Sequence, residues 1–362
     1  MQSDLFDDIL TLLKGLISTP SFSKEEDGTA ALLMQFLEDR GVPAKRHGNN
    51  VWALNRDYDP LKPTILLNSH HDTVKPNPQY TKDPFHPLVE SGRLYGLGSN
   101  DAGGCLVSLI GAFLHFYDRE KMDYNLLLAA TAEEEISGRN GIESLLPLLP
   151  PVDCAIVGEP TKMNLAVAEK GLMVLDGVSH GKAGHAAREE GENALYKVLD
   201  DLEWFRTYRF PTVSAWLGPV KMSVTVIETE NKAHNVVPAV CRYTVDVRVT
   251  DAYSHEEVLG IIRKNISSEV TPRSLRMRAT RIEEDHPLVR AGIAMGKEAY
   301  GSPTSSDKAL MPFPALKCGP GDSARSHTAD EYVEVEEVRR GLSDYIQLLE
   351  SVIGGASPAA NK

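Results

Sequence analysis

The feature that most constrains this chain is an apolar strand that ends abruptly in a polar cluster. Residues Ile65–Leu67 are typical of a buried strand, and the polar run Asn68–Asp72 follows at once. In open α/β sheets, ligands bind at the carboxyl ends of the strands. If the extended conformation continues, His70 and Asp72 point to one face and His71 to the other. This pair suits a metal ligand and the carboxylate that orients it, although a solvated loop with two histidines fits the same residues.

Acidic residues occupy two similar positions further along the chain. Asp101 lies in a glycine-rich entry to an apolar helix, where an aspartate also serves as an ordinary N-cap. Glu133–Glu135 follow the predicted strand Asn125–Ala130. Three adjacent carboxylates repel one another unless a cation or a helix terminus offsets them, and the alternative is a solvated surface. Their place at a strand end favours a functional interpretation.

Two further positions complete the pattern. Glu159 follows the predicted strand Cys154–Val157, and His327 precedes the C-terminal helix Val335–Ile353. Two histidines and three carboxylates are the ligand set expected of a two-zinc hydrolase, in which one carboxylate bridges ions about 3.5–4 Å apart. The five candidate ligands are His70, Asp101, Glu135, Glu159 and His327.

The rest of the N-terminal half has helix and strand signals. An amphipathic helix is predicted to end before Pro20, and Ser23–Glu26 fits a capping box for a second helix that runs to about Arg40. Val51–Asn55 and Thr64–Asn68 are expected to be neighbouring strands.

The middle of the chain has a different character, typical of an inserted α+β domain with one sheet and two helices. The length of 362 residues also predicts two domains. The expected domains are 1–168 together with 281–362, and 169–280. Within the insert, the predicted strands are Met173–Ser179, Val220–Glu228 and Cys241–Val249, and the predicted helices are Asn193–Tyr208 and Ser254–Ile266.

Composition excludes several classes of partner. The net charge of −13 argues against binding to nucleic acid or to an anionic membrane. No apolar run approaches the roughly 18 residues of a membrane helix, and the N-terminus lacks signal-peptide character. The four cysteines show no metal-binding spacing. We therefore expect a cytoplasmic protein.

Taken together, these motifs resemble the M20 family of metallo-aminoacylases and peptidases, in the family's order and over nearly the whole chain. The resemblance implies an α/β fold: a zinc-hydrolase catalytic domain with a mixed sheet flanked by helices, and an inserted α+β, ferredoxin-like lid or dimerisation domain. It also implies a homodimer. The matching segments are His70–Val74, Gly96–Gly104, Glu133–Glu135, Gly158–Thr161 and Ser326–Thr328.

The resemblance assigns roles to the candidate ligands. His70 and Glu159 would hold one zinc ion, Glu135 and His327 would hold the other, and Asp101 would bridge the two. Co²⁺ and Mn²⁺ fit the same nitrogen and oxygen ligands.

The resemblance also assigns roles to residues that do not bind metal. Asp72 would orient His70, and Glu134 would be the general base. His185 would stabilise the oxyanion, from its own subunit or from the partner. Asn235 and Arg248 would bind the substrate, although Arg248 is also typical of a strand residue in a salt bridge.

The expected reaction is hydrolysis of an N-acyl amino acid, with N-acetyl-ornithine or N-succinyl-ornithine as the preferred substrate. N-succinyl-diaminopimelate, N-acetyl-lysine derivatives and dipeptides stay open as alternatives. A non-catalytic binding homologue would lack a ligand or the base, and the sequence has all of them. A succinyl carboxylate would need a nearby cation, for which the candidates are Lys82, Arg93, Lys170 and Arg325.

Overall fold

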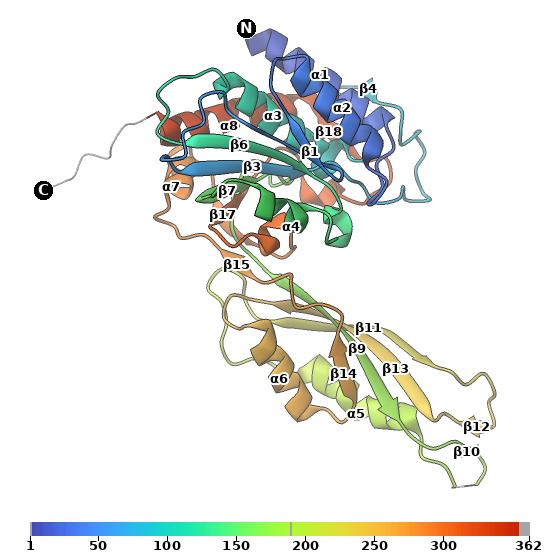
Figure 1. Cartoon of the computed structure of the whole chain (residues 1–362). Coiled ribbons are helices and arrows are strands. Elements are labelled where there is room, and N and C mark those ends of the chain that lie inside the picture. The colour runs from blue at the N-terminus through green and yellow to red at the C-terminus, as the bar shows by residue number, and fades with distance from the viewer. Residues whose placement is uncertain (1, 189, 355–362) are drawn as a thin grey trace, which may run out of the picture. The chain divides into compact units, whose positions relative to one another are not determined.

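The computed structural model describes residues 2–188 and 190–354, and the chain divides into two compact units (Figure 1). Unit 1 contains the chain up to Val167, the segment Ile282–Tyr300 and the residues from Ser306 onward. Unit 2 contains Ala168–Arg281 and Gly301–Ser305. The expected insert, 169–280, therefore falls within unit 2.

Unit 1 is built on a mixed sheet with the strand order β1-β2-β6-β3-β7-β17-β8. The central strands β6, β3, β7 and β17 run parallel, whereas β1, β2 and β8 pair antiparallel with their neighbours. Every residue of β3 and β6 is buried, as expected for parallel strands that are covered on both faces. The strands are β1 (Lys45–His47), β2 (Asn50–Leu54), β3 (Thr64–His70), β6 (Asn125–Thr131), β7 (Cys154–Val157), β8 (Leu165–Glu169) and β17 (Ala315–Lys317).

Helices cover both faces of this sheet. The apolar helix α3 packs against β3 and β6 and lies beside α8 (Figure 1). On the opposite face, Leu66 and Leu127 pack with Ile142 and Leu145 of the short helix α4. Unit 1 also contains a smaller antiparallel sheet of β4, β5 and β18. The elements are α1 (Gln2–Ser18), α2 (Asp27–Glu38), α3 (Gly104–Phe116), α4 (Ile142–Leu145), α7 (Pro287–Ala294), α8 (Val335–Ile353), β4 (Leu88–Glu90), β5 (Arg93–Tyr95), β16 (Ala299–Ser302) and β18 (Tyr332–Glu334).

Two local predictions in unit 1 are wrong. The helix α2 begins at Asp27 with Glu26 at its N-cap, because the hydroxyl of Ser23 donates to Asp72 Oδ2 at 2.7 Å instead of capping the helix. The strands β2 and β3 are not neighbours, because β6 lies between them. The chain leaves β3, crosses over through α3 and returns as β6 parallel to β3, so β2 pairs with the other edge of β6.

Unit 2 has a four-stranded antiparallel sheet in the order β11-β13-β9-β14. Its chain order, strand–helix–strand–strand–helix–strand, confirms the expected ferredoxin-like insert. Alternate residues of β9 are buried, and this face joins one hydrophobic core with the two helices. The elements are β9 (Gly171–His180), β10 (Gly184–His185), α5 (Ala194–Thr207), β11 (Lys221–Thr229), β12 (Val236–Val237), β13 (Val240–Val249), α6 (His255–Asn265), β14 (Glu269–Pro272) and β15 (Thr280–Arg281).

The helices of unit 2 begin where polar caps satisfy their first N–H groups. Asn193 accepts from the backbone of Leu195 and Tyr196 at the start of α5. Ser254 and Glu257 form a capping box at the start of α6. Across the described residues of both units, no helix combines the length and apolarity needed to cross a membrane.

Candidate metal centre

The candidate ligands come together because three parallel strands end at one edge of the sheet. In the register of β3 with β6, His70 lies opposite Thr131, four residues before Glu135. In the register of β3 with β7, Asn68 lies opposite Val157, two residues before Glu159. The carboxyl ends of parallel strands therefore deliver these groups to one place, as in other open α/β sheets.

Asp101 lies between two histidine–glutamate pairs. Its Oδ1 is 3.3 Å from His70 Nε2, and its Oδ2 is 3.7 Å from His327 Nε2. His70 Nε2 is also 3.8 Å from Glu159 Oε1, and His327 Nε2 is 2.9 Å from Glu135 Oε2. In each three-residue group, the potential ligand atoms lie within 4.8 Å of one another. The two groups share Asp101, which offers one oxygen to each.

The donor atoms and charges of this cluster fit divalent metal ions. Imidazole nitrogens and carboxylate oxygens are ligands for zinc and for several related ions. Burial raises the pKa of Glu134 well above its ordinary value, and the charge of Glu159 adds to this rise. The hydrogen bond that His327 donates to the Glu135 carboxylate raises the pKa of His327 to about 9. A cation placed among these carboxylates would offset their repulsion.

The ring of His70 is oriented so that Nε2 faces the cluster. Its Nδ1 donates to the backbone carbonyl of Asp72 at 3.0 Å and lies 3.4 Å from the Oδ1 of the same residue. With the proton held on Nδ1, the lone pair of Nε2 is free to bind a metal ion. Burial opposes protonation of this ring, but Asp101 and Asp72 together raise the pKa of His70 well above its ordinary value.

Asp72 also holds the backbone of Glu134 and Glu135 in place. Its Oδ1 accepts the backbone N–H of Glu134 at 3.0 Å, and its Oδ2 accepts that of Glu135 at 3.2 Å. The hydroxyl of Ser23 donates a third hydrogen bond to this carboxylate, also at Oδ2. One buried carboxylate thus connects the end of β3 to the turn after β6.

The three consecutive glutamates point in different directions. Glu133 has a positive φ of 54°, and its carboxylate accepts from the backbone and side-chain nitrogens of Asn140 at 3.2 and 2.8 Å. Glu134 Oε2 lies 4.0 Å from His70 Nε2, and Glu135 pairs with His327. Glu133 is therefore structural, while the next two residues face the cluster.

His71 points away from the cluster. Its Nε2 donates to the carbonyl oxygen of Asn49 at 2.9 Å, and its Nδ1 lies 2.8 Å from Thr29 Oγ1. Burial lowers the pKa of His71 to about 4, so the ring is neutral at pH 7. This histidine ties the N-terminal segment to the end of β3.

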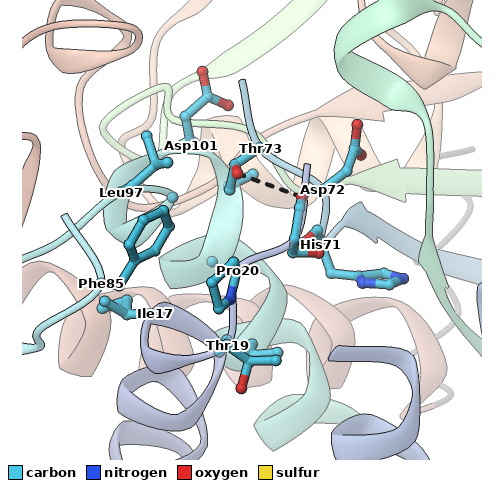
Figure 2. A pocket seen from close by; sticks show the side chains of 14 residues that line it. Ile17, Thr19, Pro20, His71, Asp72, Thr73, Phe85, Leu97 and Asp101 are labelled. Carbon is cyan, nitrogen blue, oxygen red and sulfur yellow. Dashed lines mark hydrogen bonds between the residues drawn. The ribbon is translucent and has the colours of Figure 1, made fainter. Parts of the chain in front are cut away.

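A small cavity lies behind the cluster (Figure 2). It measures about 20 Å³, which is room for a single water molecule, so it does not admit an amino-acid substrate. In Figure 2 the carboxylates of Asp72 and Asp101 point away from the apolar side chains of Ile17 and Phe85, which line the cavity. The apolar side chains that line the cavity thus pack next to the segments that carry Asp72 and Asp101.

Two buried carboxylates near the cluster were missed in the sequence. Asp307 accepts from Thr131 Oγ1 at 2.7 Å, and burial raises its pKa to about 6. Glu331 accepts the backbone N–H groups of Asp101, Asn100 and Gly98. Asp307 lies in a serine-rich stretch with no strand or glycine signal. Glu331 lies in the segment that carries His327. Its place four residues after that histidine is the one feature of the sequence that could have indicated a role near the site.

The three expected substrate residues all lie in unit 2. His185 and Asn235 are exposed and close to each other, since the backbone N–H of Ala186 donates to the Asn235 carbonyl at 2.9 Å. Arg248, on β13, makes a bidentate salt bridge with Asp246 at 2.8 and 3.0 Å. The salt bridge that was the alternative for Arg248 is thus present.

Comparison with known proteins identifies the family. The model of peptidase family M20/M25/M40 matches residues 66–351. The chain belongs to this family. It is accordingly an enzyme that hydrolyses amides, as the motifs predicted.

Individual relatives agree with this assignment. A succinyl-diaminopimelate desuccinylase 2 from a Ruegeria species is 26% identical, over 71% of this chain and 69% of the relative. A succinyl-diaminopimelate desuccinylase from Cereibacter sphaeroides is 24% identical, over 93% of this chain and 99% of its own. A dinuclear metal-binding peptidase of the M20 family from Bacillus subtilis has the same fold, with a TM-score of 0.75 at 14% identity, over 97% of this chain and 99% of that one.

Proposed function

We propose that the protein is a two-zinc hydrolase that removes the succinyl group from an N-succinyl amino acid, with N-succinyl-diaminopimelate as the first candidate substrate. The observation that carries the proposal is the position of Asp101, whose two oxygens face two different histidine–glutamate pairs. The names of the relatives favour this substrate over the acyl-ornithines expected from the resemblance.

Each three-residue group would hold one metal ion. His70, Asp101 and Glu159 form one group, and Asp101, Glu135 and His327 form the other. Bound divalent ions lower the pKa of water toward ~7 and polarise the carbonyl of an amide. Zinc is the proposed metal because it favours mixed imidazole and carboxylate ligands, and Co²⁺ or Mn²⁺ fits the same donors.

Glu134 is the proposed general base. It takes a proton from the water that attacks the amide carbonyl, the C–N bond then breaks, and the same proton passes to the leaving amine. The products are a carboxylate and a free amine. Asp72 fixes the backbone of Glu134, and the burial that raises the pKa of Glu134 makes its ionised carboxylate a stronger proton acceptor.

His185, Asn235 and Arg248 are the proposed substrate-binding residues, and unit 2 is the proposed surface of a homodimer. The four cations considered for the succinyl carboxylate already have partners. Three of them are in salt bridges, and the fourth donates to a backbone carbonyl. The pairs are Lys82 with Glu90, Arg93 with Glu334, Arg325 with Glu337, and Lys170 with Pro219.

The test is release of free amine by the purified, zinc-loaded protein, with and without a chelator. The panel contains N-succinyl-diaminopimelate, N-succinyl-ornithine, N-acetyl-ornithine and several dipeptides. We expect chelator-sensitive cleavage with the highest kcat/KM for N-succinyl-diaminopimelate. Preferred cleavage of an acyl-ornithine or of a dipeptide would contradict the substrate, and cleavage that survives complete removal of metal would contradict the mechanism.

A further inference from the structure

Glu331 contacts the loop of the shared ligand through backbone hydrogen bonds. Its Oε1 accepts the N–H groups of Asn100 and Asp101, both at 2.9 Å, and its Oε2 accepts that of Gly98 at 3.2 Å. The residue is only 2% exposed. Exclusion of water strengthens hydrogen bonds in the protein interior. Glu331 therefore clamps the loop that carries Asp101.

This loop needs such a clamp because its backbone is not regular helix around Asp101, so its N–H groups lack the usual helical acceptors. Asp101 has φ −118° and ψ 94°, which is not helical, although the helix α3 begins at Gly104. Backbone N–H groups in such a turn must find partners elsewhere when they are buried. Glu331 supplies the acceptor for three of them.

Glu331 is itself held in a fixed position. It directly precedes β18, which pairs with β5, and its carbonyl oxygen accepts the N–H of Gly96 at 3.0 Å. The strand β18 continues into α8, whose first turn is closed by a capping box between Glu334 and Glu337. The clamp thus starts from a paired strand and a capped helix, which are rigid elements.

We infer that Glu331 is a positioning residue, which orients Asp101 so that its two carboxylate oxygens face the two halves of the metal centre. Glu331 lies four residues after His327. One short segment therefore carries a ligand of the second group and holds the ligand that both groups share. This inference rests on the proposed metal binding.

The test is calorimetric titration of the metal-free protein with zinc chloride, for the wild type, Glu331→Gln and Asp330→Asn. Asp330 is a matched control, because its carboxylate also accepts backbone N–H groups, those of Thr81 and Lys82 at 2.8 and 2.9 Å, but in a different loop. We expect Glu331→Gln to weaken zinc binding by about 10–100-fold, the usual cost of losing a residue that orients a ligand. Asp330→Asn is expected to bind zinc as the wild type does.

Kinetics separate positioning from a merely structural role. Glu331→Gln is expected to lower kcat at saturating zinc while KM changes by less than about threefold, since Glu331 is buried beneath the loop and not exposed to bound substrate. If this variant loses only thermal stability, with zinc affinity and kcat unchanged, the inference is wrong. Should Glu331→Gln not fold, Glu331→Asp carries the same test, because it keeps the carboxyl group but shortens its reach to the three N–H groups. Absence of zinc binding by the wild type would instead contradict the proposed function.

Discussion

The charged groups of the two units are arranged in opposite ways. In unit 1, five predicted ligands from strand ends and loops far apart in the sequence converge, and carboxylates face one another across a few ångströms. In unit 2, Arg248 on β13 is neutralised by Asp246, two residues before it on the same strand. Carboxylates that repel one another at close range need an additional cation, whereas a paired arginine does not. Several carboxylates crowded around two histidines therefore distinguish the candidate centre from an ordinary polar surface.

The largest effect is expected from Asp101→Asn, which removes the charge shared by both groups. We expect loss of bound zinc and a fall in kcat/KM of at least about 10²–10³-fold, the scale of losing one electrostatic stabiliser. Elemental analysis and the amine-release assay measure both. The control is Asp246→Asn in unit 2, which should retain the wild-type zinc content. Equal zinc content in the two variants would contradict the inference that the carboxylates of unit 1, and not those of unit 2, bind metal.

The second-largest effect is expected from a comparison of two adjacent residues, Glu134 and Glu133. Glu134→Gln should lower kcat by about 10²–10⁴-fold with zinc content unchanged, because it removes only the proton acceptor. Glu133→Gln should instead lower the free energy of unfolding by about 1–3 kcal/mol, because it weakens the bonds to Asn140, and leave kcat of the folded protein near wild type. Loss of zinc from Glu134→Gln would mean that base and ligand have been exchanged in our assignment.

A smaller effect is expected for Arg248→Gln. If Arg248 binds the substrate carboxylate, KM should rise by about 10–100-fold, as for the loss of a charge-assisted hydrogen bond. The matched control is Arg242→Gln on the same strand, whose salt bridge with Glu230 is at the surface and should leave KM unchanged. Identical KM values for the two variants would mean that Arg248 does not bind the substrate and serves only in its salt bridge with Asp246.

The smallest effect on turnover is expected for His71→Gln, which should change stability instead. The folded-state pKa of about 4 lies below the ordinary 6.5, so the unfolded chain takes up a proton first as the pH falls. The contribution of neutral His71 is complete above pH 6.5 and is lost toward pH 4. Between pH 6.5 and 5 the wild type should lose about 2 kcal/mol more than the variant in denaturant unfolding. Parallel pH curves would contradict this.

Much of the fold was readable from local patterns. The helices α3 and α8, the strands β3, β6 and β7, and the alternation of β9 and β13 followed from hydrophobic periodicity, because burial imposes that period on each element separately. The order of strands did not follow. The strand β6 lies between β2 and β3 because the crossover through α3 brings the chain back on that side of β3. The residues of β2 do not indicate on which side this happens.

The sequence by itself determined which residue types follow each strand, and therefore the family, the five candidate ligands and the candidate base. Only the tertiary structure decided the direction of each side chain. It turned Glu133 toward Asn140 and Glu135 toward His327, aimed the two oxygens of Asp101 at different histidines, and placed Glu331 under the loop of Asp101. The physical reason is that these directions depend on backbone angles at turns and on hydrogen-bond partners up to 233 residues away along the chain.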